Sequence, residues 1–326
     1  MLIRPELAAL RGDDTAQRRA QSAMGAALDR WRALPVVRAI DDDLARWARG
    51  HDLDELPALS ALVAPGGADA VRLAAGVVDA FLAELVRAPL GQSPLRHYQD
   101  DVMASVTGLR QGMAALTLLT IDGQRLQPGG ADGSARFAPT ETIDVVLAGT
   151  ARADRVLLRS IEGKRADLAI EPVTLCAGDV SHRLGREESL QFRTAPAGVT
   201  LLRLQRRVEG DGITREYALD DGRLLHQAAA TPRDSRLELA AALLGRMGRA
   251  DAAPLLAAMA EESGSPALRW QVLRECLALD AGEGFAALCR IAANPTDPLA
   301  VTAGALRAQL IETYPQLAGL APCPAN

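Results

Sequence analysis

Apolar residues in the first third of the chain recur at the spacing of an α-helix. In residues 15–35, "TAQRRAQSAMGAALDRWRALP", side chains such as Leu28 and Trp31 fall on one face. Residues 66–91, "GGADAVRLAAGVVDAFLAELVRAPLG", repeat this pattern with a broader apolar stripe. We therefore expect a helical domain over residues 1–112.

The pattern then changes to short apolar runs of alternating character. Segments such as "TIDVVLAG", "RVLLRSI" and "VTLLRLQRRV" are separated by turn dipeptides such as "EG" and "DG". Eight candidate strands of this kind lie between residues 113 and 230. Short antiparallel strands at this density are typical of a β-sandwich or barrel, so we expect an antiparallel β-domain over residues 113–230.

The helical period returns at residue 231, and here it repeats. Placing "LLGRMGRADAAPLLAAMA" over "ECLALDAGEGFAALCRIA" at an offset of 32 pairs Leu244 with Cys276 and Leu256 with Leu288. A third segment, "DPLAVTAGALRAQLIETY", adds one more helix in the same phase. Internal repeats of this length predict stacked helical hairpins over residues 231–326.

The segments "SPALRWQVLREC" and "LDAGEGFAAL" resemble the helical hairpins of HEAT-repeat proteins, over about residues 234–313. This resemblance implies an α-solenoid that binds another macromolecule, and another protein is the expected partner. The expected contact face comprises Arg269, Trp270 and Arg274. Because fewer than three repeats are present, the block should pack on another domain.

The central segments "VVLAGTARADRVLL", "VTLCAGDVSHRL" and "SLQFRTAPAGVTLLRLQR" are similar to the later half of a cupin, a small double-stranded jelly roll. In that family a glycine and acid pair, here Gly178 and Asp179, opens a strand, and a histidine shortly after can point into the barrel. Strand alternation places Val180, His182 and Leu184 on one face. If that face is inward, these three residues line a ligand pocket.

Metal-binding cupins also present a His-x-His pair and a glutamate on earlier strands. This chain has four histidines, at positions 51, 97, 182 and 226, and none forms such a pair. Since a metal site needs three or four ligands with supporting hydrogen bonds, we predict no metal and no cofactor. His182 is then either a pocket residue in a metal-free barrel or a half-buried histidine without a chemical role.

His97 and Asp101 form a second candidate pair. The start of "SPLRHYQDDVMASV", residues 93–106, has a serine suited to cap a helix and a proline suited to its first turn. On that expected helix, residues four apart project from one face, so the pair could bind a metal or orient the imidazole for proton transfer. A solvated helix pair is the other interpretation. No G-x-S-x-G element accompanies them, and we predict no catalytic residue.

Composition narrows the class of protein. The net charge of −5 argues against a dominant nucleic-acid surface, and 48% hydrophobic with 24% charged residues is typical of a globular chain. The four cysteines, at positions 176, 276, 289 and 323, lack the paired spacing of a zinc site or a disulfide framework. Neither a secretory signal nor an apolar membrane span is visible, so we expect a cytoplasmic protein without membrane contact.

Taken together, these patterns predict an α+β multidomain chain. It comprises a helical domain (1–112), a cupin-like antiparallel β-sandwich or jelly roll (113–230) and HEAT-like repeats (231–326). We expect a non-enzymatic protein-interaction or regulatory scaffold that uses the HEAT-like helices. The alternative is a small-molecule sensor, or a metal-independent enzyme, with a ligand pocket inside the β-domain.

Overall fold

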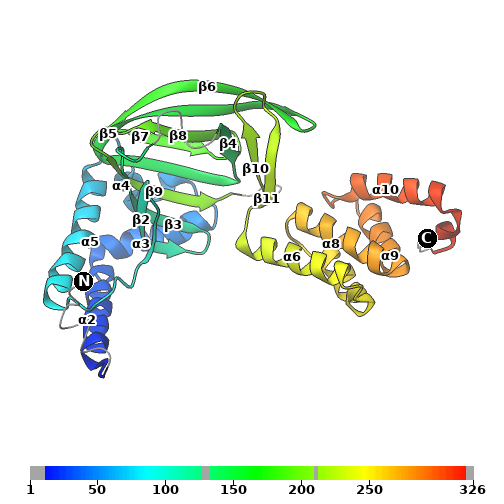
Figure 1. Ribbon diagram of the computed structural model, residues 1–326, viewed down its shortest axis with the longest axis horizontal. Coiled ribbons are helices and arrows are strands. Elements are labelled where there is room, and N and C mark those ends of the chain that lie inside the picture. Colours follow the sequence, from blue (N-terminus) through cyan, green and yellow to red (C-terminus); the bar gives the residue numbers. More distant parts are fainter. Residues whose placement is uncertain (1–11, 127–132, 209–211, 321–326) are drawn as a thin grey trace. The chain divides into compact units, whose positions relative to one another are not determined.

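The computed structural model describes residues 12–126, 133–208 and 212–320. The chain forms two compact units: Met1–Val208 with Tyr217–Leu224, and Glu209–Glu216 with Leu225–Asn326. Antiparallel strands make up the middle of the chain and helices lie toward both ends, which confirms the α+β class (Figure 1). Whether the three predicted segments act as separate domains stays a prediction.

Helices α2, α3, α4 and α5 precede the strands in the first unit. On α2, Met24, Leu28 and Trp31 are buried as the apolar spacing predicts. Pro35 occupies the first turn of α3, where its missing N–H leaves no helix hydrogen bond unmade. The bounds are α2 (Thr15–Arg32), α3 (Pro35–Ala48), the 3-10 helix η1 (Leu53–Glu55), α4 (Pro57–Leu62) and α5 (Ala68–Arg87).

The strands begin before the expected boundary at residue 112. Their bounds are β1 (Arg96–Gln99), β2 (Met103–Gln111), β3 (Ala114–Ile121), β4 (Ser134–Phe137), β5 (Thr140–Glu162), β6 (Arg165–Cys176), β7 (Val180–Leu184), β8 (Glu188–Thr194), β9 (Val199–Arg207), β10 (Ile213–Ala218) and β11 (Leu224–Ala229).

The helix predicted over residues 93–106 is therefore wrong. Strands β1 and β2 form a hairpin in which His97 pairs with Val106. The Asp100 carboxylate closes the turn by accepting hydrogen bonds from the backbone N–H groups of Val102 and Met103. Pairing of β2 with β3 along its length outweighs the local start signal of Ser93 and Pro94, because propensity is weaker than tertiary context.

Strand β5 is long and belongs to both layers of the β-structure. Its first half pairs with β9 and β7, and its second half pairs with β6 and β8. The N–H of Ala138 donates to the carbonyl of Gly185, while the N–H of Leu158 donates to the carbonyl of Glu187. The start of β5 and a residue in its second half thus bond to the same short turn, which requires the strand to bend between them.

Gly149 lies at this bend, next to a register shift between Val146 and Ala148. Its φ is +84°, and a Cβ atom there would come within 2.2 Å of the Gly198 carbonyl oxygen. Glycine is therefore required at the bend. The result is an antiparallel sandwich in which one layer has the order β1-β2-β3-β9-β5-β7 and the other is formed by β6, β5 and β8.

Helices α2, α3, α4 and α5 cover the outer face of the first layer (Figure 1). Leu116 of β3, Leu204 of β9 and Val145 of β5 share one hydrophobic core with Leu28 and Trp47 of the helices. Successive strand residues point to opposite faces, so the intervening residues of these strands point between the two β-layers. This division into a helix-facing and an interior face decides where each candidate residue lies.

The second unit contains helices α6–α10, together with most of β11 and the start of β10. The helices are α6 (Pro232–Arg246), α7 (Ala253–Glu261), α8 (Pro266–Leu279), α9 (Ala281–Ala293) and α10 (Ala300–Thr313), with the 3-10 helices η2 (Ala250–Ala252) and η3 (Pro315–Leu320). Helix α6 packs on α8, α7 packs on α8 and α9, and α9 packs on α10, which is the arrangement of stacked hairpins. The repeat partners Leu256 and Leu288 are both buried. Assignment to a HEAT-like family stays a prediction.

Candidate ligand site

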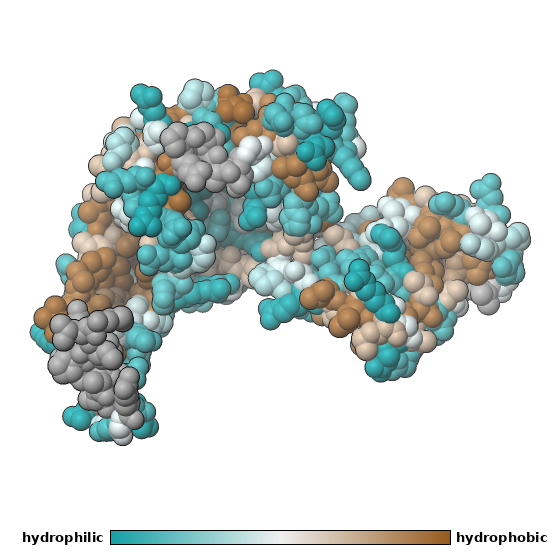
Figure 2. All heavy atoms as spheres, viewed as in Figure 1, coloured by the Kyte–Doolittle hydropathy of each residue, from teal (hydrophilic) through white to brown (hydrophobic). Residues whose placement is uncertain are grey.

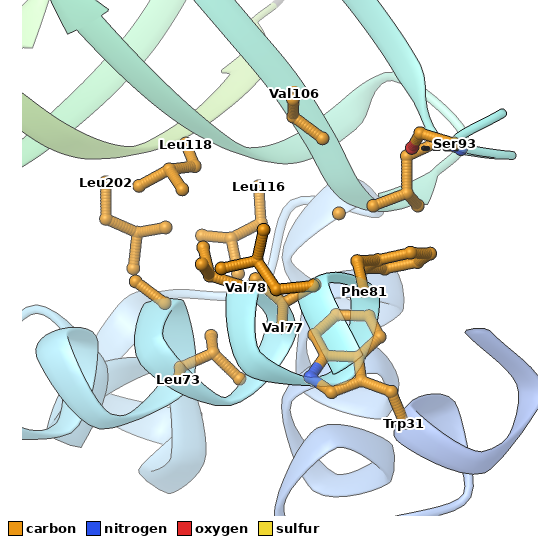
Figure 3. Close-up of a pocket in the computed structure, with 14 residues that line it drawn as sticks. Trp31, Leu73, Val77, Val78, Phe81, Ser93, Val106, Leu116, Leu118 and Leu202 are labelled. Carbon is orange, nitrogen blue, oxygen red and sulfur yellow. Dashed lines mark hydrogen bonds between the residues drawn. The ribbon is translucent and has the colours of Figure 1, made fainter. Parts of the chain in front are cut away.

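An apolar pocket lies between α5 and the helix-facing side of the sheet (Figure 3). Its volume is about 190 Å³. Trp31 of α2 and Phe81 of α5 border it from the helices, and Leu116, Leu118 and Leu202 border it from β3 and β9. The remaining lining residues are Leu73, Ala74, Val77, Val78, Leu82, Ser93, Leu95, Val106 and Gly108.

Two features of the sequence account for the apolar pocket. Helix α5 presents apolar residues at 73, 77 and 81, one turn apart, so a single stripe faces the sheet along the pocket. On the sheet, Gly108 sits in a bulge of β2, between Thr107 and Leu109, and offers no side chain. A Cβ atom on Gly108 would stand 3.5 Å from Trp31, so the missing side chain leaves the ring uncovered.

The pocket has a buried floor and an exposed rim. Trp31 and Leu116 are buried, whereas Leu82 at the mouth is 55% exposed. In Figure 2, hydrophobic side chains gather over α5, where Val78 and Leu82 lie at the surface. Ser93 is the single lining residue with a polar side chain other than the indole of Trp31, and it is exposed at the entrance. The pocket thus accepts an apolar body and places one hydroxyl near its entrance.

The interior face of the sandwich has an apolar core that includes Val146 and Leu201, and beside it a buried charged cluster. Asp144 of β5 is 1% exposed and accepts two hydrogen bonds from Arg203 of β9, at 2.7 and 3.0 Å. Arg183 of β7 pairs with the same carboxylate at 2.8 Å. Burial alone would raise the pKa of Asp144, but the two guanidinium groups outweigh it and hold that pKa below its usual range.

A second ion pair extends this interior network. Glu188 of β8 is buried, and its Oε2 accepts a hydrogen bond from Nη2 of Arg155 on β5 at 2.9 Å, while its Oε1 lies 2.8 Å from Nε of the same arginine. Burial lowers the pKa of Arg183, and nearby Arg203 lowers it further, while Asp144 and Glu188 oppose this effect. The space in which a cupin-like barrel was expected to hold a ligand therefore contains paired charges from four strands, β5, β7, β8 and β9.

His182 does not face that interior. Val180, His182 and Leu184 share one face, as alternation predicts, but it is the helix-facing side, because Val180 packs on the core that includes the helices. The side chain of His182 is 56% exposed, and its Nε2 lies 2.8 Å from Glu141 Oε1. Glu141 also binds Arg206, which donates to the Trp47 carbonyl. The geometry is that of an ion-pair chain at the edge of the sheet, in which Glu141 and Arg206 are largely buried and His182 is the exposed end. Ligand binding by His182 stays a prediction.

His97 and Asp101 are not brought together. His97 lies on β1 with its Nδ1 3.3 Å from the Leu95 carbonyl oxygen. Asp101 lies in the following turn, where its fully exposed carboxylate is 3.6 Å from Arg125. The expected shared helix face does not exist, since these residues are in a hairpin.

Of the expected partner face on the second unit, Trp270 and Arg274 line an open groove about 710 Å³ in volume. Arg269 does not join them. It is 5% exposed, binds Asp297 with two nitrogens at 3.2 and 2.5 Å, and donates to the Ala260 carbonyl. The expectation that Arg269 is exposed is wrong, because this guanidinium is an internal link between helices.

Among the described residues, no group of three or more His, Cys, Asp or Glu side chains is placed to hold a metal ion. Cys176, Cys276 and Cys289 are free thiols, and Cys323 lies outside the described residues. No helix in the described ranges combines the length and apolar character needed to cross a membrane.

No protein-family model and no curated protein matches the chain. Solved structures with a similar fold over part of it include the 7S globulin of Momordica charantia, at 12% identity and a TM-score of 0.27 over 38% of this chain and 35% of that chain. KdgF from Halomonas sp. is 12% identical, with a TM-score of 0.25, over 34% of this chain and 88% of that chain. A sugar phosphate isomerase from a cupin superfamily from Silicibacter pomeroyi is 16% identical, with a TM-score of 0.25, over 39% of this chain and 79% of that chain.

The chain thus spans about a third of the length of the globulin. Each of these similarities leaves more than half of this chain unmatched. The β-structure of this chain is defined by its own strand pairing and register. The candidate pocket lies on the face of the sheet that α2 and α5 cover.

Proposed function

We propose that the first unit is a small-molecule sensor that binds an apolar compound between α5 and the sheet. The observation that carries this proposal is a pocket of about 190 Å³ without a charged side chain in its lining. An engineered apolar cavity of about 150 Å³ is large enough to bind benzene. The ligand is therefore a compact molecule with an apolar body and at most one small polar end.

Packing energetics support occupancy of this pocket. Core cavities cost about 24 cal/mol per Å³, so a closed void of this size would destabilise the unit by about 4–5 kcal/mol. Because the mouth is open at Leu82, water reaches part of the space and the cost is a fraction of that figure. An apolar ligand offsets this cost by covering Trp31, Phe81 and Leu116.

The chemistry of the lining favours binding over catalysis. A general acid, base or nucleophile must touch the reacting atoms, and Ser93 is the one lining residue with a hydroxyl. No titratable side chain lines the pocket beside it. The interior of the sandwich offers titratable groups, but there Asp144 and Glu188 are engaged by arginines.

The test is a titration of the full chain with straight-chain alcohols of increasing length and with benzyl alcohol. Trp31 lines the pocket, so its fluorescence should respond, and a Trp31→Phe variant should lose the signal while keeping ligand-dependent thermal stabilisation. Each methylene that enters the pocket should tighten binding about fourfold, at about 0.8 kcal/mol, until the space is filled. Absence of any stabilisation or emission change across the series would contradict the proposal.

A further inference from the structure

The second unit carries a groove that is independent of the pocket described above. It runs between α8, α9, α10 and η3, and its volume is about 710 Å³. Leu277, Phe285, Leu306 and Leu310 provide an apolar lining that continues the core of this unit. In Figure 2, hydrophobic side chains gather on the visible surface around α9 and α10.

Arg274 is the one charged side chain that lines this groove. It is exposed, and within the described residues it makes no hydrogen bond or ion pair. Arg269 and Arg290 differ, since Arg269 is bound to Asp297 and Arg290 is bound to Glu261 by two hydrogen bonds. Arg307 of α10 is also exposed, but it does not line the groove. An unpaired guanidinium at the side of an apolar groove is complementary to a carboxylate that arrives with an apolar partner.

The other lining residues with a polar group are Trp270, Tyr314 and Gln316. Trp270 is half-buried on α8, and Tyr314 is 50% exposed after α10. Tryptophan, tyrosine and arginine dominate the energetics of protein interfaces, because each combines a large apolar surface with a hydrogen-bond donor. Here all three border one groove whose base is aliphatic and aromatic.

We propose that this groove binds an amphipathic helical segment of another protein that carries an acidic residue beside its apolar stripe. The apolar side chains of the segment lie on Leu277, Phe285 and Leu310. A glutamate or aspartate near them makes a two-pronged ion pair with Arg274, which fixes the register of the helix in the groove.

The experiment is a selection of displayed helical peptides against the full-length protein. The library holds peptides of about 16 residues, roughly four turns, with apolar residues fixed at i, i+3, i+4 and i+7 and all other positions randomised. We expect the selected peptides to carry Asp or Glu next to the apolar stripe. Replacing that acid by lysine, or making Arg274→Glu in the protein, should weaken binding by about tenfold or more. Exchanging both charges together should restore it.

A matched control is Arg246→Glu, because Arg246 is also exposed on a helix of this unit but does not line the groove. It should leave peptide binding unchanged, and Trp270→Ala should reduce it. A selection that enriches no peptide, or peptides that bind Arg274→Glu as well as the native protein, would overturn the proposal. So would self-association that Trp270→Ala abolishes, which would identify a second copy of the chain as the occupant.

Discussion

Gly108 faces Trp31 across the apolar pocket, and a Cβ atom on the glycine would stand 3.5 Å from the indole ring. That spacing is an ordinary van der Waals contact, so Gly108→Ala should fold and Gly108→Val should occupy part of the pocket. We expect stepwise loss of alcohol binding from glycine to alanine to valine, measured by Trp31 emission and by thermal shift. The native protein at a ligand concentration of about 100 times Kd should gain about 2.7 kcal/mol.

Gly76→Ala is the control for this series. Gly76 also lies in the first unit, on α5, but nothing stands within 4 Å of the position of its added Cβ. It should bind the alcohols like the native protein. Equal binding by Gly108→Val and the native protein would show that the ligand does not enter the space beside Trp31.

Substitution of His182 tests whether the strand face of Val180, His182 and Leu184, which the sequence predicts to line a pocket, binds the ligand. Its imidazole is more than half exposed and pairs with Glu141 at the edge of the sheet, away from the pocket lining. Because His182 is more than half exposed and Glu141 keeps its hydrogen bond from Arg206 when the imidazole is removed, this pair contributes about 0–1 kcal/mol. His182→Ala should therefore leave alcohol binding unchanged and lower the free energy of unfolding by less than about 1 kcal/mol. Loss of ligand-dependent stabilisation in this variant would restore His182 as a binding residue.

The sequence predicts the elements of this chain better than their orientation. The stripe on α5 and the alternation of Val180, His182 and Leu184 follow from local periodicity, and both are present. Which side of β7 faces the helices depends on pairing with β5, a contact of high sequence separation that periodicity does not encode. The hairpin at residues 96–111 was also missed because a tertiary contact decides it: pairing of β2 with β3 outweighs the capping signal at Ser93.

The buried ion pairs between the β-layers could not be predicted from the sequence either. Asp144, Arg183 and Arg203 lie on three different strands, and nothing in their spacing identifies them as partners. The register of β5 with β7 and β9 brings them together, because Asp144 pairs with Ser181 on one side and with Arg203 on the other. These three charges are close together only because of the order and register of β7, β5 and β9.

Asp144→Asn should destabilise the first unit strongly. The variant leaves the buried Arg183 and the largely buried Arg203 without a carboxylate, and breaking a buried ion pair in this way costs about 3–5 kcal/mol. Asp101→Asn is the control, because Asp101 is fully exposed and should change stability by no more than about 0.5 kcal/mol. Chemical denaturation followed by tryptophan emission measures both.

The same carboxylate should make stability depend on acid. The pKa of Asp144 is lower in the folded unit than in the unfolded chain, so its stabilisation is present above its unfolded pKa, about 3.9, and is lost as pH falls through the lower folded value. Denaturation midpoints of the native protein should fall below about pH 4 more steeply than those of Asp144→Asn. Parallel curves for the two proteins would show that Asp144 contributes nothing to acid sensitivity.

Arg269 and Arg274 stand five residues apart on α8 and should respond in opposite ways to substitution. Arg269 is buried between Asp297 and the Ala260 carbonyl, so Arg269→Ala leaves a buried carboxylate unpaired and should cost about 3–5 kcal/mol in the second unit. Arg274→Ala removes an exposed guanidinium without a partner and should change stability by less than about 0.5 kcal/mol while weakening capture of acidic peptides. Circular dichroism melts of the full chain, followed through the helical signal, distinguish the two. Similar losses of stability in both variants would mean that Arg274 supports the fold of this unit and is not free to receive a partner.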